Sequence, residues 1–129
     1  MATFMENVSG EDVTLMIVED SLGFKFGSFV FDDWKHRKKF YGSGESFVYT
    51  FRDSESVDAY YGTGNNSMYQ YCDSTCIGVG GDKYDGRFAL YLGDDFYRGS
   101  STKTSCFDNE VLSSKSEFLC VEMEIWGFG

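Results

Sequence analysis

Two carboxylates near the end of the sequence have a spacing that could do chemistry. In the segment FLCVEMEIWGFG, residues 118–129, Glu122 and Glu124 are two positions apart. On a strand their side chains would share one face, about 7 Å apart. Carboxylates at that distance are typical of inverting glycosidases, so one hypothesis is a carboxylate hydrolase. Acids on strands more commonly pair with Lys or Arg of a neighbouring strand, and we favour a structural role for both.

The cysteines are a second group of reactive side chains: Cys72, Cys76, Cys106 and Cys120. Structural zinc sites usually have two closely spaced pairs of ligands, whereas this sequence has one CxxxC pair and a single histidine, His36. We therefore expect no metal and no other cofactor. The thiols are best interpreted as small, partly buried side chains. The alternative is a cysteine-based redox sensor or peroxide scavenger that uses these four residues.

Two further segments superficially resemble reactive motifs. His36 lies in KHRKK, residues 35–39, and a histidine among cations is better explained as solvated surface, or as a contact for an acidic partner, than as part of a catalytic triad. The glycine-rich GVGGDKYDG, residues 78–86, lacks the GxGxxG and GK[ST] patterns of phosphate loops, and a strand pattern follows it. We interpret it as a turn.

The elements that must position these residues are short strands. Residues 13–18, VTLMIV, are largely apolar at both alternating sets of positions, which is typical of a strand covered on both faces. Residues 13–31 predict a hairpin. Further strands are predicted at 46–51, 68–71, 87–92, 96–100 and 118–128. About eight short strands without helical periodicity predict a mostly β, antiparallel sandwich or barrel with little helix.

The last predicted strand has two different faces. Leu119, Val121, Met123 and Ile125 form a wholly apolar face that we expect to meet the core. The opposite face carries the other side chains of the strand: Phe118, Cys120, Glu122, Glu124, Trp126 and Phe128. The preceding residues 100–117 are rich in Ser and Thr and lack periodicity. A structureless stretch of that length is unusual in a compact domain and is often functional.

Length and charge limit the classes of function. The 129 residues fit one domain, 1–129. The formal net charge of −10 and the sequence pI of about 4.4 disfavour nucleic-acid binding, because phosphates would be repelled. No run of about 18 apolar residues predicts membrane insertion. The N-terminal MATFMENVSGED lacks the pattern of a secretory signal, so we expect reduced thiols in the cytoplasm.

Four blocks of sequence, in this order, resemble the TLDc domain of the oxidation-resistance protein family. They are LMIVEDSLGFKFGSF (15–29), FYGSGESFVYTF (40–51), GVGGDKYDGRFALYL (78–92) and FYRGSSTKTSCFDNEVLSSKSEFLCVEMEIWGF (96–128). The glycine run departs from the family pattern at Lys83 and Tyr84. Family domains typically begin with a further helical portion, which is not seen before residue 13, so the chain is expected to be a short form.

This resemblance implies a two-sheet antiparallel β-sandwich without enzyme activity. It also implies a protein-binding module that protects against oxidative stress and regulates the vacuolar-type proton ATPase, whose subunits would be its partners. Its location would be cytoplasmic, with mitochondria, or the vacuolar membrane surface reached through a partner, as alternatives. A sheet edge left uncovered by the missing helical portion would favour self-association.

The positions that match the family motifs are the site residues that the resemblance implies. They are Gly42, Gly44, Glu45, Gly80, Gly81, Gly99, Ser100, Cys106, Asn109, Glu124 and Trp126. We expect Glu124 to hold residues 100–112 in place through hydrogen bonds, because Ser, Thr and Asn there supply donors. Trp126 and Phe128 are expected to cover the edge of the sheet.

Overall fold

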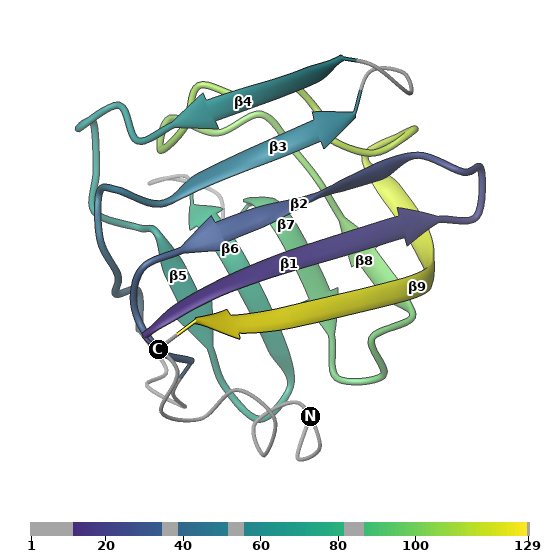
Figure 1. Ribbon diagram of the computed structural model, residues 1–129, viewed down its shortest axis with the longest axis horizontal. Helices are drawn as coiled ribbons and strands as arrows, with labels where there is room; N and C mark the ends of the chain where they lie inside the picture. Colours follow the sequence, from purple (N-terminus) through teal and green to yellow (C-terminus); the bar gives the residue numbers. More distant parts are fainter. Residues whose placement is uncertain (1–11, 35–38, 52–55, 82–86, 129) are drawn as a thin grey trace.

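Nine strands make up the regular structure of this computed structural model (Figure 1), which describes residues 12–34, 39–51, 56–81 and 87–128. The strands are β1 (Val13–Asp20), β2 (Lys25–Val30), β3 (Phe47–Phe51), β4 (Val57–Tyr61), β5 (Gln70–Cys72), β6 (Cys76–Gly81), β7 (Phe88–Gly93), β8 (Arg98–Ser100) and β9 (Glu117–Phe128). His36 and the departures at Lys83 and Tyr84 lie outside the described residues.

All nine strands belong to one antiparallel sheet in the order β4-β3-β2-β1-β9-β8-β7-β6-β5. The prediction of a mostly β, antiparallel fold is therefore confirmed. Two separate sheets are not confirmed, because hydrogen bonds connect the strands without a break through β9. The first three residues of β9 pair with β8, and residues from Cys120 onward pair with β1. One long strand, β9, thus joins the β1–β4 half of the sheet to the β5–β8 half.

The core lies between the two halves of this sheet. In Figure 1, β5–β8 lie behind β1–β4. Side chains from both halves form one buried cluster, with Met16 and Phe26 on one side and Ile77 and Leu90 on the other. Phe118 of β9 meets Phe26 edge to face, with ring centroids 4.9 Å apart. Burying these apolar surfaces is the main force that holds the two halves together.

The predicted faces of the last strand are wrong in its first half. Phe118 and Cys120 are buried, whereas Val121 and Leu119 are exposed. The cause is a β-bulge. Glu19 pairs with Glu122 but Asp20 pairs with Cys120, so Val121 has no opposite residue. An extra residue on one strand reverses the alternation beyond it, and Met123 and Ile125 then face the core as expected.

The glycine-rich segment is also different from its prediction as a turn. Gly78, Gly80 and Gly81 lie in β6, and every residue of that strand is buried. A Cβ on Gly78 would come within 2.4 Å of the ring of Phe88, and one on Gly81 within 2.7 Å of the ring of Phe40. These glycines therefore leave room for aromatic rings over a buried strand.

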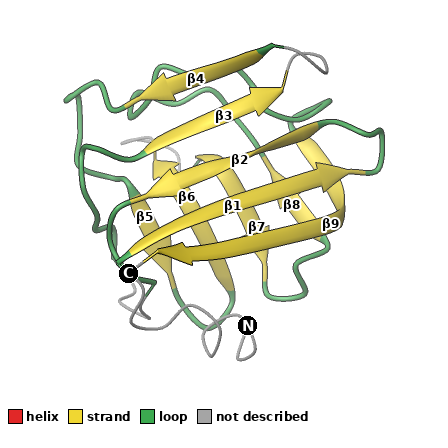
Figure 2. Cartoon of the chain, in the orientation of Figure 1, coloured by secondary structure: helices red, strands yellow, loops and turns green. Residues whose placement is uncertain are grey.

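Within the described ranges, the chain consists of strands and loops only (Figure 2). No helix there is long and apolar enough to cross a membrane.

Candidate functional site

The segment between β8 and β9, residues 101–116, is a packed loop, which we call the plug loop. Figure 1 shows it as the light green segment that follows β8. Its Phe107 and Leu112 are part of the core. The hydroxyl of Thr50 in β3 donates to the carbonyl of Leu112 at 2.6 Å, and the amide of Thr63 donates to the carbonyl of Cys106 at 3.0 Å. The amide of Thr102 donates to the carbonyl of Phe88 in β7 at 2.9 Å. The long irregular stretch predicted from the sequence is confirmed, and these contacts fix it to both halves of the sheet.

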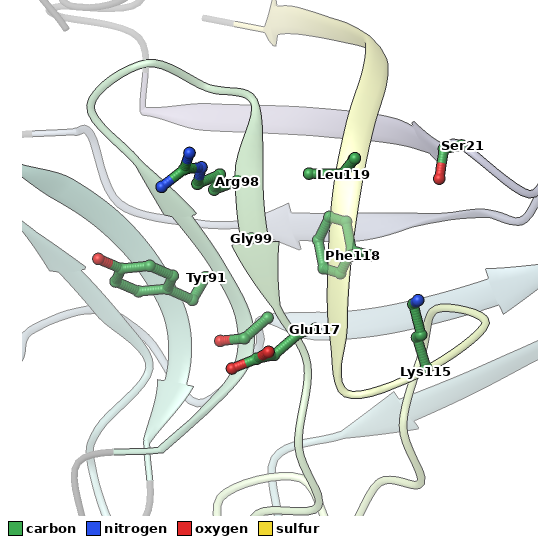
Figure 3. A pocket seen from close by; sticks show the side chains of 9 residues that line it. Ser21, Tyr91, Arg98, Gly99, Lys115, Glu117, Phe118 and Leu119 are labelled. Carbon is green, nitrogen blue, oxygen red and sulfur yellow. The ribbon is translucent and has the colours of Figure 1, made fainter.

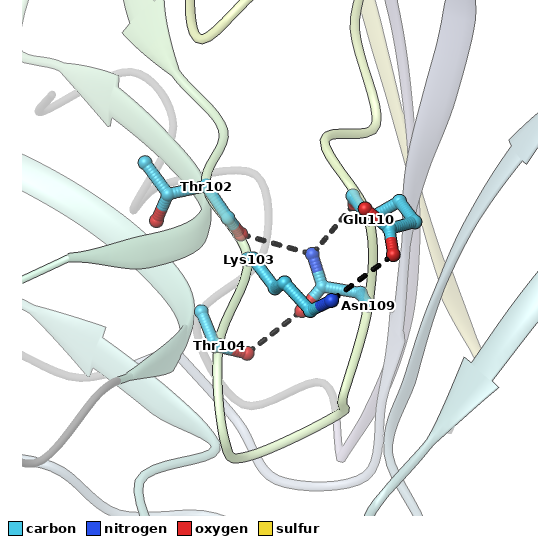
Figure 4. Close-up of polar contacts among 5 residues, drawn as sticks. All are labelled: Thr102, Lys103, Thr104, Asn109 and Glu110. Atoms are coloured by element: carbon cyan, nitrogen blue, oxygen red, sulfur yellow. Dashed lines mark hydrogen bonds and ion pairs between the residues drawn. The ribbon is translucent and has the colours of Figure 1, made fainter.

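Asn109 organises the plug loop from inside (Figure 4). Its buried side-chain amide donates to the carbonyl oxygens of Thr102 and Glu110, at 2.9 and 2.8 Å. Its carbonyl oxygen accepts from the hydroxyl of Thr104 at 2.7 Å. Outside this network, the exposed Lys103 and Glu110 form an ion pair at 3.2 Å. A buried amide with all these partners satisfied fixes the local path of the backbone.

Two of the matched glycines allow aromatic rings close to the plug loop. Gly80 has a φ of +71°, and a Cβ there would approach the ring of Phe107 to 2.4 Å. Gly99 in β8 is in extended backbone, and its Cβ would approach the ring of Phe118 to 2.5 Å. Gly80 thus makes room for Phe107 of the plug loop, and the thiol of Cys106 in the same loop donates to the carbonyl of Met68 at 3.5 Å. Gly99 instead makes room for Phe118 at the start of β9.

The turn before β3 holds three other matched positions. Gly42 has a φ of +112°, and a Cβ there would lie 3.1 Å from the Cβ of Tyr69. Gly44 lies against the hydroxyl of the same tyrosine. Glu45 is exposed, and its amide donates to the Ser43 hydroxyl at 3.2 Å. This turn is therefore shaped by contacts with Tyr69, and Glu45 faces solvent.

Asp20 is the buried acid that sequence reasoning missed. One oxygen of its carboxylate accepts from the amides of Leu22 and Phe24, each at 3.0 Å. The other accepts from the amide and hydroxyl of Ser114, at 3.0 and 2.8 Å. Burial by itself would raise the pKa of this carboxyl, but the hydrogen bonds from Ser114, Phe24 and Leu22 lower it on balance. Its position before a Ser-Leu-Gly turn is a signal for the local bonds, whereas no sequence signal points to Ser114.

The role expected for Glu124 is not found. Glu124 is exposed on β9 and, within the described residues, forms no hydrogen bond to the plug loop. Glu124 lies between Met123 and Ile125, which face the core, so its side chain points away from the core, and the anchoring role belongs to Asp20 instead. Trp126 and Phe128 are also exposed, on strand β9 in the interior of the sheet order rather than at an edge.

A groove of about 600 Å³ lies beside the bend of β9 (Figure 3). Its walls come from β7, β8, β9 and the end of the plug loop, and they include the matched Gly99 and Ser100. Arg98 and Lys115 supply positive charge, Glu117 supplies negative charge, and Tyr91 supplies an aromatic ring. A groove with this lining can hold a polar peptide segment by hydrogen bonds and charge.

The four cysteines are free and buried. Burial raises the pKa of Cys72 to about 12 and the pKa values of Cys76 and Cys106 to about 11, and it raises that of Cys120 as well. Because the thiolate is the reactive species, these thiols are poorly suited to reaction with peroxide at neutral pH. No group of three or more His, Cys, Asp or Glu side chains in the described part of the chain is arranged to hold a metal ion.

The carboxylates of Glu122 and Glu124 border a small cavity of about 140 Å³ together with Ile17, Glu19 and Lys25. Lys25 approaches Glu19 at 3.9 Å. Both glutamates are exposed on the outer face of the sheet. The cavity is smaller than the clefts of about 300 Å³ or more that take ordinary ligands, so this geometry gives no support to the hydrolase hypothesis.

Comparison with known proteins identifies relatives of the whole chain. The family model of the TLDc domain matches residues 1–129. Oxidation resistance protein 1 from Rattus norvegicus is 35% identical over 129 residues, which are 99% of this chain and 15% of that protein. Nuclear receptor coactivator 7 from Homo sapiens is 32% identical over 125 residues, 97% of this chain and 13% of that protein. The chain thus spans about one seventh of the length of these curated relatives.

Proposed function

The chain belongs to the TLDc domain family, and on this premise we propose that it is a non-catalytic protein-binding module that acts in protection against oxidative stress. The observation that carries the proposal is the family match along the whole chain, together with relatives named for oxidation resistance. Among the motif residues, Gly80, Cys106 and Asn109 help to seat the plug loop. The motif residues in that cluster are therefore accounted for by packing, without a reaction.

The vacuolar-type proton ATPase is the partner that we propose. The family resemblance supplies this choice. The chain's formal charge of −10 is compatible with docking on a basic protein surface, because complementary charge accelerates encounter between proteins. Binding would place the module at the cytoplasmic surface of the membrane that carries the pump, without inserting into it.

Co-sedimentation of the purified chain with the soluble sector of the pump, combined with an ATPase assay, tests this proposal. We expect stoichiometric association and a change in ATP hydrolysis that saturates with added chain. An unrelated acidic β domain of similar size and net charge serves as the control and should do neither. Failure to associate, with ATP hydrolysis unchanged, would remove the pump from the proposal.

The cysteine-based redox alternative is separable from this proposal by mutation. The burial of all four thiols and their raised pKa values disfavour it. Replacing the four cysteines with alanine, after the melting temperature shows that the variant is folded, should leave protection of peroxide-treated cells intact. Loss of protection in a folded variant would favour a thiol mechanism over a binding module.

A further inference from the structure

The outward side of the β1–β4 half of the sheet carries a continuous set of large apolar side chains, the outer aromatic face. It consists of Leu15, Phe29, Phe47, Tyr61, Trp126 and Phe128. Strand register places five of them in one row across the sheet. Leu15 pairs with both Phe29 and Trp126. Phe47 pairs with both Phe29 and Tyr61. Their sequence neighbours Met16, Val30, Val48 and Ile125 point the other way, into the core.

The rings of this face touch one another across four strands. Phe29 stacks on Phe47 with centroids 5.5 Å apart, and Phe47 lies 5.1 Å from Tyr61. On the other side, Phe29 lies 6.1 Å from Phe128. In Figure 1 this face belongs to the strands nearest the viewer, β1–β4 and β9. The face is therefore one connected surface and not a scatter of single exposed residues.

The outer aromatic face is uncovered within the described part of the chain. Tyr61 is 61% exposed, Trp126 55% and Phe128 50%, and the other three are half-buried by their neighbours. Contiguous exposed apolar surface of this kind marks interaction sites in soluble proteins. Trp and Tyr are also the residues that most often dominate binding energy. The sequence of β1 points the same way, since residues 13–18 are apolar on both sides, as in strands with both faces covered.

Negative charge borders this face at one end. Glu19, Glu122 and Glu124 lie on the same side of the sheet, next to the row that contains Leu15 and Trp126. Lys25 is the one described cation among the outward residues of β1, β2, β3, β4 and β9. A partner for this surface must therefore bring both apolar side chains and positive charge.

We propose that the outer aromatic face binds an amphipathic helix of a partner protein, with apolar residues on the side toward the sheet and Lys or Arg along one flank. The row from Tyr61 to Trp126 crosses five strands, about 19 Å, which a helix of about 13 residues spans. A helix laid on a sheet is a standard way to bury an apolar sheet face. A second copy of this chain is a poorer occupant, because both the chain and this face are acidic.

This inference rests on the proposed function in one respect, that the domain is a protein-binding module, and it does not require the proton pump to be the partner. The inference assigns the binding surface of the domain and the chemical character of the partner segment. Anionic membranes are disfavoured by the same three glutamates, which would be repelled by the lipid headgroups.

A displayed library of helical peptides tests the proposal without the pump. The peptides are about 14 residues long, with apolar residues fixed at positions i, i+3, i+4 and i+7 and both flanks randomised. Peptides that bind the wild-type chain are selected, and those that also bind the Trp126→Ser/Phe128→Ser variant are removed. We expect enrichment of Lys and Arg on one flank. No enrichment over the depleted variant, or enrichment of neutral or acidic flanks, would overturn the proposal.

The enriched peptide is then measured in solution by fluorescence anisotropy. We expect Trp126→Ser/Phe128→Ser to weaken binding about tenfold or more, and Glu122→Lys/Glu124→Lys to weaken it about tenfold and to reduce its salt dependence. The matched control Leu22→Ser/Tyr97→Ser removes two exposed apolar residues away from this face and should leave affinity within about twofold. An equal loss of peptide affinity in the control variant would contradict the assignment of the binding site to the outer aromatic face.

Two further measurements keep the result independent of any one variant. Hydrogen exchange of the wild-type chain with the peptide should show protection in β1, β3 and β9 and none in β5–β7. Sedimentation and vesicle binding test the other occupants. A dimer that the Trp126→Ser/Phe128→Ser variant abolishes would assign the face to self-association. Binding to phosphatidylserine vesicles, abolished by the same variant, would assign it to membranes.

Discussion

Asp20 ties together two segments that are 94 residues apart in sequence. Its carboxylate closes the β1–β2 turn through Leu22 and Phe24 and holds the end of the plug loop through Ser114. A buried carboxylate is stable only when its oxygens are satisfied, and here each oxygen accepts two hydrogen bonds. This residue performs the anchoring that the sequence suggested for Glu124.

We predict that Asp20→Asn lowers the free energy of unfolding by about 1–3 kcal/mol at pH 7, because an amide cannot accept all of these hydrogen bonds. The pKa of Asp20 is lower in the folded state than in the unfolded chain, so its stabilisation is complete above about pH 5 and is lost as pH falls through the folded-state pKa. Urea unfolding at pH 7 and at about pH 3 should therefore show a smaller difference between variant and wild type in acid.

Glu45→Gln is the control for that experiment, because Glu45 is exposed. It should change stability by less than about 0.5 kcal/mol. A variant at Asp20 as stable as this control at pH 7 would refute the anchoring role.

The raised pKa values of the cysteine thiols predict that these side chains react slowly in the folded protein. With pKa values of about 11 to 12 for Cys72, Cys76 and Cys106, few thiolates exist at neutral pH, so alkylation by iodoacetamide in the native state should be slow. The rate should rise as the pH approaches those values, provided the chain stays folded. Mass spectrometry counts the labelled thiols, and all four should react in concentrated urea. Rapid native labelling at neutral pH would contradict the burial argument.

Strand β9 shows how one residue changes the role of a whole element. Its first half buries Phe118 and Cys120, its second half packs the partly buried Met123 and Ile125 against the core, and the bulge at Val121 lies between them. Without the bulge, one of these pairs would point outward. The strand can therefore serve both halves of the sheet only because Val121 is unpaired.

Deletion of Val121 should destabilise the protein by about 3 kcal/mol or more. Restoring strict alternation removes either Phe118 and Cys120 or Met123 and Ile125 from the core, and each large apolar side chain contributes about 1.5–3 kcal/mol. Val121→Ala is the matched control, and it should cost less than about 1 kcal/mol because Val121 is exposed. Denaturant unfolding followed by circular dichroism measures both. A deletion variant as stable as the control would mean that the register is not fixed by this bulge.

Strands whose signals are local could be predicted from the sequence, whereas features that depend on pairing between distant strands could not. Many of the strands were predictable, because short runs rich in apolar and aromatic residues between turn signals favour strands locally, as in β1, β2 and β7. The bulge in β9 was not, since it depends on the pairing of Glu19 and Asp20 with a strand about a hundred residues later. Strand β6 was missed because its glycines resemble a turn until the rings of Phe88 and Phe107 are known to lie over them.

For the site, the family motifs pointed to several residues of the plug loop, and the structure shows packing and hydrogen bonds around them. Asn109 and Cys106 do belong to the plug loop network, as Ser, Thr and Asn composition suggested. The anchoring role of Asp20 was not predicted, because two of its four hydrogen bonds come from Ser114, which is 94 residues later in the sequence. Contacts that distant leave no pattern in a single sequence.

At the scale of the whole molecule, we expect the sheet and its core to unfold as one cooperative unit. The two halves share hydrogen bonds through β9 and one buried cluster. A small domain of this kind is expected to unfold in a single transition.

Ile77→Ala tests this cooperativity across the core. Ile77 lies in β6, whereas the buried Trp34 is bonded to Thr14 of β1 in the opposite half. The substitution should lower the free energy of unfolding by about 2–5 kcal/mol. Tryptophan fluorescence and far-ultraviolet circular dichroism should shift to the same lower denaturant midpoint. Midpoints that separate would show that the halves unfold independently.

The place of β9 in the chain has a consequence for synthesis on the ribosome. β1 is translated about a hundred residues before β9, yet β9 is one of its two neighbours in the sheet, so Val13 can pair with Phe128 only after that delay. Until that late segment leaves the exit tunnel, β1 and β8 each present an open edge to other nascent polypeptides. Chaperones that shield such edges should therefore have their largest effect on nascent chains in which β8 has been translated and β9 has not.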